Sequence, residues 1–200
     1  MTDLPVQRLL LDAVAVVESA RLPYMVLGGF AVRAWAIPRP TFDADVAVEA
    51  DDAQLAGLLR MLAANGFDVP AEHRDGFQDS VAGMPKVRVS RFADGRVWEV
   101  DVFLVRTPLL RSALARRRAV EIGGRPVQVM APEDVILLKL VANRPRDVAD
   151  IDDLLLLAAP LDLAYVRAWA DRIAVRDRLE ARIAGVGGGP PPAGSHPATA

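Results

Sequence analysis

Three short stretches decide the fold: Tyr24-Met25-Val26-Leu27-Gly28-Gly29, Phe42-Asp43-Ala44-Asp45-Val46-Ala47-Val48 and Glu99-Val100-Asp101-Val102-Phe103-Leu104. The first is a β-rich run that ends in a glycine pair, just before a segment with helical character. In the second, Asp43 and Asp45 alternate with apolar residues, which is typical of a strand. In the third, Asp101 interrupts an apolar run. All three stretches predict strands, and the second and third carry carboxylates on one face and apolar side chains on the other.

Helices and further strands surround these stretches. Apolar spacing, proline-led helix starts and glycine-containing turns indicate where each element begins and ends. We expect helices at about 4–20, 30–36, around 55–62, 108–118, 132–143, 146–158 and 162–183, hairpins at 86–92 with 96–105 and around Gly123-Gly124, and a loop over 70–85. This order predicts an α/β (α+β) fold, in which a mixed β-sheet is flanked by helices and followed by a C-terminal helical part.

The composition divides the chain into three parts. Residues 1–130 contain all the predicted strands and form the expected α/β core. Residues 131–184 are predicted to be helical and to pack on that core. Residues 185–200 are dominated by Gly, Pro, Ala and Ser, so we expect a disordered tail.

Composition also excludes several classes of protein. The 200 residues contain no cysteine and two histidines, which excludes a disulfide scaffold, a thiol nucleophile and a zinc site built on thiolates or many histidines. The net charge of −2 argues against wholesale capture of nucleic acid. The longest apolar run is far shorter than the roughly 20 residues of a membrane span. There is no signal-peptide pattern at the N-terminus, so we expect a cytoplasmic protein without a membrane partner.

The carboxylates suggest a metal site. If the strands carrying Asp43, Asp45 and Asp101 are neighbours, three negative charges converge, and their repulsion raises the pKa values unless cations neutralise them. Oxygen ligands of this kind suit Mg²⁺, and two such ions can clamp the attacking and leaving oxygens of a phosphoryl-type displacement. The backbone N–H groups of Gly28 and Gly29 could face a triphosphate. We therefore expect Asp43, Asp45 and Asp101 to bind two Mg²⁺ ions.

Each feature also has a simpler interpretation. A glycine pair is most often a turn, and aspartates at alternate strand positions usually line a solvated face. Lys139, in an apolar helix, could extend its ammonium group to water. A cluster of arginines at 111 and 116–118 could bind an RNA acceptor or could lie on a solvated helix. The order and combination of the glycines and carboxylates favour the metal site.

The same residues resemble a known family. Leu27-Gly28-Gly29, Asp43-Ala44-Asp45-Val46 and Val100-Asp101-Val102 look like the signature of the DNA polymerase β-type nucleotidyltransferase superfamily. Additional residues resemble its AbiEii-like branch, which includes toxins of toxin–antitoxin systems: Arg39-Pro40-Thr41, Pro132-Glu133-Asp134, Lys139, Arg146-Asp147 and Asp150. The match covers about residues 20–160. Many relatives have a lysine where this chain has Arg146 and a serine where it has Gly29.

This resemblance implies a nucleotidyltransferase fold and a Mg²⁺-dependent transfer of a nucleoside monophosphate from a nucleoside triphosphate to an acceptor hydroxyl. Asp43 and Asp45 would hold the ions, and Asp101 would hold the catalytic ion and help deprotonate the acceptor. Nucleotide binding would fall to Gly28, Gly29, Arg39, Thr41 and Lys139, whereas Lys86 would face water.

The resemblance leaves the acceptor open. It could be a tRNA end, in a toxin with a cognate antitoxin protein, or a small-molecule drug. An alternative is a non-catalytic relative that binds a nucleotide or a partner protein. The roles of Arg146, Asp147 and Asp150 stay open.

Overall fold

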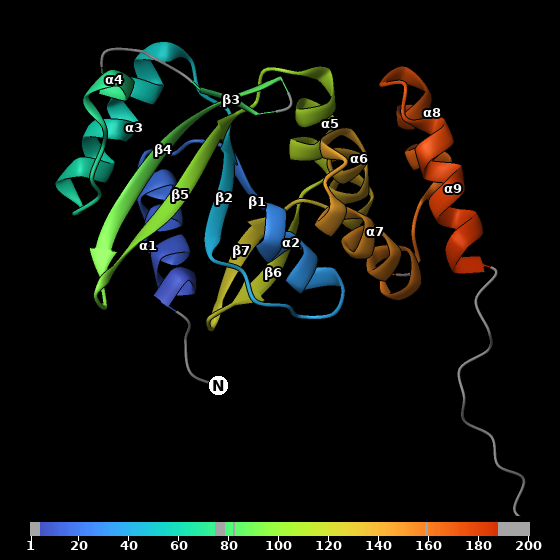
Figure 1. The fold of residues 1–200 in the computed structure, drawn as a ribbon. Coiled ribbons are helices and arrows are strands. Elements are labelled where there is room, and N and C mark those ends of the chain that lie inside the picture. The colour runs from blue at the N-terminus through green and yellow to red at the C-terminus, as the bar shows by residue number, and fades with distance from the viewer. Residues whose placement is uncertain (1–4, 75–78, 82, 159, 188–200) are drawn as a thin grey trace, which may run out of the picture.

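One seven-stranded sheet lies at the centre of the protein, in the order β3-β4-β5-β2-β1-β7-β6 (Figure 1). The structure is a computed structural model that describes residues 5–74, 79–81, 83–158 and 160–187. The strands are β1 (Tyr24–Leu27), β2 (Asp43–Val48), β3 (Asp79–Val81), β4 (Met84–Ala93), β5 (Arg96–Leu104), β6 (Arg118–Ile122) and β7 (Arg125–Val129). The sheet contains both parallel pairs, β2–β5 and β1–β7, and antiparallel pairs, which confirms the predicted mixed α/β architecture.

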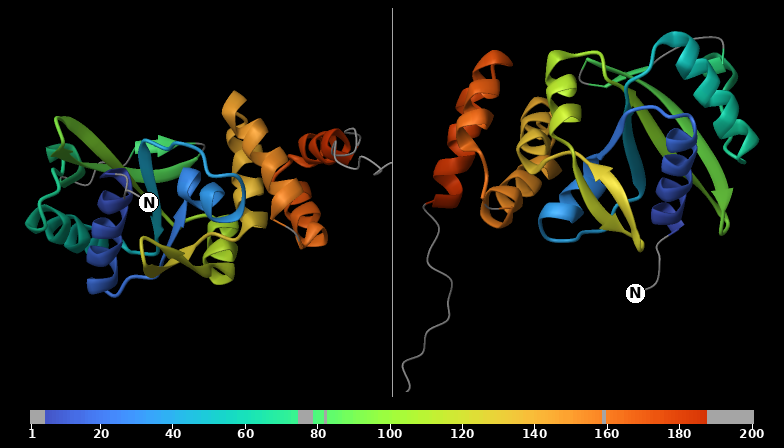
Figure 2. Two further views of the ribbon diagram at one scale, coloured as in Figure 1. Left: turned by 90° about the horizontal axis from the view of Figure 1, so that it is seen from below. Right: turned by 180° about the vertical axis from the view of Figure 1, so that it is seen from behind.

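Helices flank this sheet and extend beyond one end of it (Figures 1 and 2). They are α1 (Pro5–Ser19), α2 (Gly28–Trp35), α3 (Asp52–Ala64), α4 (Ala71–Arg74), α5 (Pro108–Arg116), α6 (Pro132–Ala142), α7 (Pro145–Leu157), α8 (Leu163–Arg172) and α9 (Arg176–Gly187). Helix α1 packs on β2 and β5, and α2 connects the sheet to α6 and α7. Helices α8 and α9 lie outermost and contact α6 and α7.

The register between β2 and β5 places the carboxylates. These strands are parallel neighbours, and Asp45 lies opposite Asp101. The alternate positions, such as Ala44, Val46 and Val100, are fully buried in the core beneath α1. Because side chains alternate between the two faces of a strand, burial of the apolar set directs the three carboxylates to the opposite face.

The segment 70–85 is not the loop that the sequence predicts. Helix α4 forms its first turn, and β3 pairs with the start of β4 in antiparallel register. Residues 75–78 and 82 lie outside the described part of the chain. A three-residue strand is specified by the free edge of its neighbour rather than by its own sequence pattern, so periodicity could not reveal it.

The helix predicted over 162–183 is divided in two. Ala174 adopts a left-handed conformation, with φ of 55°. The N–H of Val175 donates to the carbonyl of Ala170, and the N–H of Ala174 donates to that of Asp171. These two bonds form a Schellman ending, which usually has glycine where this chain has Ala174. The absence of the usual glycine signal explains why the sequence pattern suggested one helix.

The prediction of a disordered tail over residues 185–200 is wrong for its first three residues. Helix α9 continues through Gly185 to Gly187, and residues 188–200 lie outside the described residues. The predicted boundary at residue 130 falls between β7 and α6, and the division into two parts stays a prediction. Within the described ranges, no helix is long and apolar enough to cross a membrane.

The Schellman ending generates a stability prediction. An L-residue in the left-handed region costs about 1 kcal/mol relative to glycine, and Ala174 is exposed, so Ala174→Gly should raise the free energy of unfolding by up to about 1 kcal/mol. Ala168→Gly is the control, because Ala168 is exposed inside α8, where glycine should destabilise by about 1 kcal/mol. Urea denaturation of both variants measures the difference. Equal destabilisation would contradict the role given to Ala174.

Candidate active site

All the site residues predicted from the sequence line one cavity. Its volume is about 260 Å³, and it opens where β1, β2 and β5 meet the helical part of the chain. The predicted residues in its wall are Gly28, Gly29, Arg39, Thr41, Asp43, Asp45, Asp101 and Lys139. Apolar residues, among them Met84, Phe103 and Val135, also line the cavity.

Gly28 brings the backbone against a carboxylate. Its φ is +63°, and a Cβ atom at this position would lie 1.9 Å from Oδ2 of Asp45. Leu27, the residue before it, pairs with Asp45 in the β1–β2 register. Both the left-handed conformation and the close approach require a residue without a side chain. Gly28 therefore begins α2 directly beside the Asp45 carboxylate, and the predicted preceding turn is part of the helix itself.

Thr41 and Gly29 position the other β2 carboxylate. The Thr41 hydroxyl lies 3.2 Å from both Oδ1 and the main-chain carbonyl oxygen of Asp43. Thr41 is buried, and a Cβ atom on Gly29 would lie 2.5 Å from its hydroxyl oxygen. The absence of a side chain at Gly29 thus leaves room for Thr41, which orients Asp43. In this structure the Thr41 hydroxyl contacts the Asp43 carboxylate.

Asp45 has the most perturbed carboxyl group of the cavity. Burial, and after it the negative charges of Asp43 and Asp101, raise the pKa of Asp45 to about 7. Lys86 and Arg144 act in the opposite direction but do not offset these effects. Such a carboxylate gains most from a nearby cation, because a cation removes the repulsion that disfavours its charged form.

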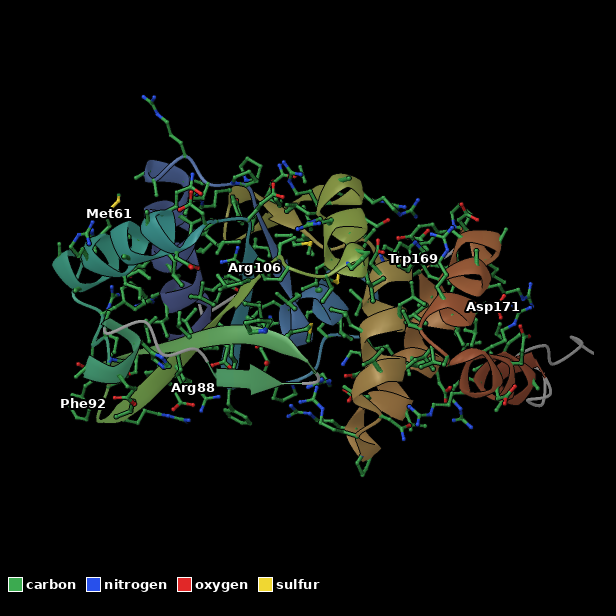
Figure 3. All side chains as sticks on the ribbon, turned by 90° about the horizontal axis from the view of Figure 1, so that it is seen from above. Met61, Arg88, Phe92, Arg106, Trp169 and Asp171 are labelled. Carbon is green, nitrogen blue, oxygen red and sulfur yellow. The ribbon has the colours of Figure 1, made fainter. Side chains whose placement is uncertain are left out.

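Asp101 is held by two cations instead. Oδ2 of Asp101 accepts from Lys86 Nζ at 2.6 Å, and Arg88 donates from Nε to Oδ1 at 2.7 Å and from Nη2 to Oδ2 at 3.0 Å. Burial disfavours the charged carboxylate, but the hydrogen bonds from Arg88 and Lys86 outweigh it and hold the pKa of Asp101 below its ordinary value. Figure 3 labels Arg88 on β4.

The prediction that Lys86 faces water is wrong. Its side chain is 4% exposed and lies in the cavity wall, with its ammonium 6.0 Å from the centroid of the Phe103 ring. Lys86 and Arg88 are alternate residues of β4, so both project from the face that carries Asp101 on neighbouring β5. Both lysines of the chain, Lys86 and Lys139, thus line the same cavity.

A second ion-pair network connects Lys139 to the opposite wall. Lys139 Nζ donates to Asp147 Oδ1 at 3.0 Å and to Asp150 Oδ2 at 2.6 Å. Arg39 forms a bidentate pair with Asp150, and Arg144 binds Asp147 through its guanidinium and its main-chain N–H. Hydrogen bonds to these cations hold the pKa values of Asp147 and Asp150 below normal, although burial acts in the opposite direction.

This network gives a role to two residues left open by the sequence. Asp147 and Asp150 are almost fully buried and lie three positions apart on one face of α7. They fix Lys139 of α6 and Arg39 of the segment before β2 at the edge of the cavity. The signal in the sequence was the pair of acids on an apolar helix face, five and eight residues after the last residue of α6.

Cationic side chains outnumber carboxylates among the residues that line the cavity, and four of these cations pair with Glu99, Asp147 or Asp150. Six cationic side chains, Arg39, Lys86, Arg88, Lys139, Arg144 and Arg146, line it together with three carboxylates. Arg146 is exposed, and no hydrogen bond or ion pair to it occurs among the described residues. The cationic side chains that line this site can therefore give a polyanionic ligand several charge-assisted contacts.

The other arginine cluster has a structural role. Arg116 pairs with Glu133 and Asp134, and Arg118 pairs with Glu133. Both acids are buried at the start of α6. These ion pairs join α5 and β6 to the helical part, so the solvated-helix interpretation and the RNA-binding interpretation each miss the contacts that these arginines make.

The donor set fits one divalent cation better than it fits two. Asp43 and Asp45 offer carboxylate oxygens without a cationic partner among the described residues, and oxygen ligands suit Mg²⁺. Asp101 is occupied by Lys86 and Arg88. Within the described residues, no three His, Cys, Asp or Glu side chains are grouped so that they could hold a metal ion. The two predicted ions therefore stay a prediction.

Solved structures with a similar fold are nucleotidyltransferases or resemble them. A nucleotidyltransferase-like antigenic protein from Paracoccidioides brasiliensis is 20% identical, with a TM-score of 0.53 and 90% of each chain covered. The antibiotic-resistance factor ANT(2'')-Ia is 17% identical, with a TM-score of 0.54 and coverage of 93% of this chain and 97% of its own. Another structure of that factor contains adenylyl-2''-tobramycin.

A nucleotidyltransferase candidate from Thermotoga maritima is 14% identical, with a TM-score of 0.51, and covers 71% of this chain and 87% of its own. At these identities the likeness shows the fold. No curated protein matches the chain. The family model described as "Nucleotidyl transferase AbiEii toxin, Type IV TA system" matches residues 9–197. The chain is therefore a nucleotidyltransferase that belongs to the AbiEii toxin family.

Proposed function

We propose that this nucleotidyltransferase uses Mg²⁺ to transfer a nucleoside monophosphate from a nucleoside triphosphate to a hydroxyl group of an RNA acceptor. The observation that carries the proposal is Asp45, a carboxylate pressed against Gly28 and repelled by Asp43, in a cavity whose wall is otherwise rich in cations. Asp43 and Asp45 would hold the ion. Bound there, it would neutralise charge on the triphosphate and on the reacting phosphoryl group.

The proposed reaction exchanges one phosphorus–oxygen bond for another. The acceptor hydroxyl oxygen forms a bond to the α-phosphorus, and the bond from that phosphorus to the bridging oxygen breaks. Pyrophosphate leaves with the electron pair, and the hydroxyl proton passes to a base. The chain's part is to orient the triphosphate and to stabilise negative charge on its oxygens, which is the main source of catalysis in phosphoryl transfer.

The proposed nucleotide contacts come from two walls of the cavity. Gly28 and Gly29 begin α2, so their N–H groups can face phosphate oxygens. Arg39 and Lys139 lie on the opposite side and are held there by Asp150. Thr41 contributes by orienting Asp43. With two carboxylates already bound to it, Lys139 would act on phosphates as a fixed positive charge.

The rim of the cavity favours a polyanionic acceptor over a cationic drug. Arg88 and Arg144 have side chains that are 45% and 49% exposed, and Arg146 is also exposed. Arginines at this position attract phosphates of an RNA backbone and repel the ammonium groups of an aminoglycoside. We propose a tRNA end as the acceptor and, because the family includes toxin–antitoxin systems, a cognate antitoxin protein as a partner. The enzyme would bind the tRNA and the antitoxin in the cytoplasm.

The Asp45→Asn variant should lose activity and gain stability. Removing one ligand of the ion should lower transfer of labelled nucleotide to total RNA by at least about 100-fold. Without divalent ions at pH 8, the variant should be more stable than the wild type, by on the order of 4 kcal/mol. The reason is that folding raises the pKa of Asp45 from 3.8 to about 7. Ionisation as the pH rises through this window therefore destabilises the wild-type fold.

Denaturation at pH 3.5 and pH 8 in EDTA, alongside the labelling assay, measures both effects. The stability difference should vanish at the lower pH, where the carboxyl group is protonated in both states. Asp171→Asn is the control, since Asp171 is exposed on α8, where Figure 3 labels it. Near-normal turnover by Asp45→Asn would refute the assignment of Asp45 to the ion.

The Gly28→Ala variant tests the backbone approach. The new methyl group would displace the Asp45 carboxylate, and alanine would be strained at φ of +63°. We expect loss of labelling and a destabilisation larger than the roughly 1 kcal/mol of backbone strain alone. Gly66→Ala is a matched control, because Gly66 has φ of +81° and nothing within 4 Å of its would-be Cβ. If the two variants behave alike, the approach of Gly28 to Asp45 has no functional importance.

A further inference from the structure

Both carboxylate oxygens of Asp101 already have cationic partners. Oδ2 accepts hydrogen bonds from Lys86 and Arg88, and Oδ1 accepts from Arg88. All three bonds are charge-assisted and between 2.6 and 3.0 Å long. Oδ1 accepts one of these bonds and keeps a second lone pair. A divalent cation bound there would lie beside the Lys86 ammonium and the Arg88 guanidinium, which would repel it.

Lys86 cannot easily leave this position. Its side chain is 4% exposed, and Asp101 is the one carboxylate that pairs with it among the described residues. Its ammonium also faces the Phe103 ring at 6.0 Å. Separating this pair would leave a buried charge without a partner, which is strongly unfavourable.

Arg88 reinforces the arrangement from the same strand. It lies directly opposite Asp101 in the β4–β5 register, and its guanidinium also pairs with Glu99 at 3.2 Å. Lys86 and Arg88, which are neighbours on one face of β4, thus neutralise Asp101, the residue opposite Asp45 in the β2–β5 register. Together they bring positive charge to the same side of the cavity as Asp43 and Asp45.

We propose that Lys86 and Arg88 take the place of a second divalent ion at Asp101, so that the enzyme works with one ion, held by Asp43 and Asp45. This inference rests on the proposed function. Asp101 then acts as a positioning residue that holds Lys86 in the cavity wall, and Lys86 supplies a fixed charge that a two-ion site would obtain from metal.

Counting bound Mn²⁺ tests the proposal without an activity measurement. Mn²⁺ is titrated into the full chain with a non-hydrolysable ATP analogue, and the free ion is followed by electron paramagnetic resonance. We expect one ion per wild-type chain and one for Asp101→Asn. The double variant Lys86→Met, Arg88→Met should bind a second, because it leaves the Asp101 carboxylate free.

The control is the double variant Arg106→Met, Arg125→Met. Arg106 is exposed and Arg125 is half-buried, and they pair with Asp52 and Glu18, away from the cavity. The same amount of charge is thus removed elsewhere, and the count should stay at one. Figure 3 labels Arg106. Circular dichroism establishes that each variant is folded. The Asp101→Asn comparison keeps the test decisive if the Lys86 and Arg88 variant does not fold.

Different failures have different meanings. Two ions in the wild type and one in Asp101→Asn would overturn the inference and leave the proposed function intact. A count of one in the folded Lys86 and Arg88 variant would overturn the assignment to these two side chains. No ion bound by the wild type with the analogue would overturn the proposed function itself.

Discussion

Repulsion among three carboxylates on one sheet face is the constraint on which the rest of the site depends. The parallel register of β2 and β5 places Asp45 opposite Asp101, with Asp43 two residues away. This placement follows from burial of the alternate apolar residues beneath α1. A register shift that separated the charges would also expose the core, so the repulsion cannot be relieved by moving the strands apart in register.

The carboxylates differ in how their negative charge is compensated. Asp101 is neutralised within the protein by Lys86 and Arg88. Asp45 keeps a raised pKa and is held close to the Gly28 backbone, which makes it the group with most to gain from a bound cation. At the helical side of the cavity the roles of the charges are exchanged: the buried carboxylates of Asp147 and Asp150 hold the Lys139 ammonium in place. The cavity is therefore organised before any substrate enters, which lowers the cost of orienting a triphosphate.

Sequence reasoning could predict the elements whose burial follows a regular pattern. The carboxylate-bearing strands, the glycine pair and the helix starts at Pro108 and Pro132 lie where apolar alternation and proline placed them. The pattern could not show β3, which depends on the edge of β4, or the break at Ala174, which lacks the usual glycine. The partners of Asp101 were hidden for another reason. Lys86 begins an alternating strand, and nothing in one sequence distinguishes an alternating cation that faces water from one that faces a buried acid.

A crystal structure with Mn²⁺ and a non-hydrolysable nucleoside triphosphate tests the central claim most directly. The anomalous difference map should contain one manganese peak, bound by Asp43 and Asp45, with the triphosphate against Gly28 and Gly29. Lys86 and Arg88 should still pair with Asp101. Two peaks that share Asp101 as a ligand, or a nucleotide bound away from the Asp45 carboxylate, would contradict this account.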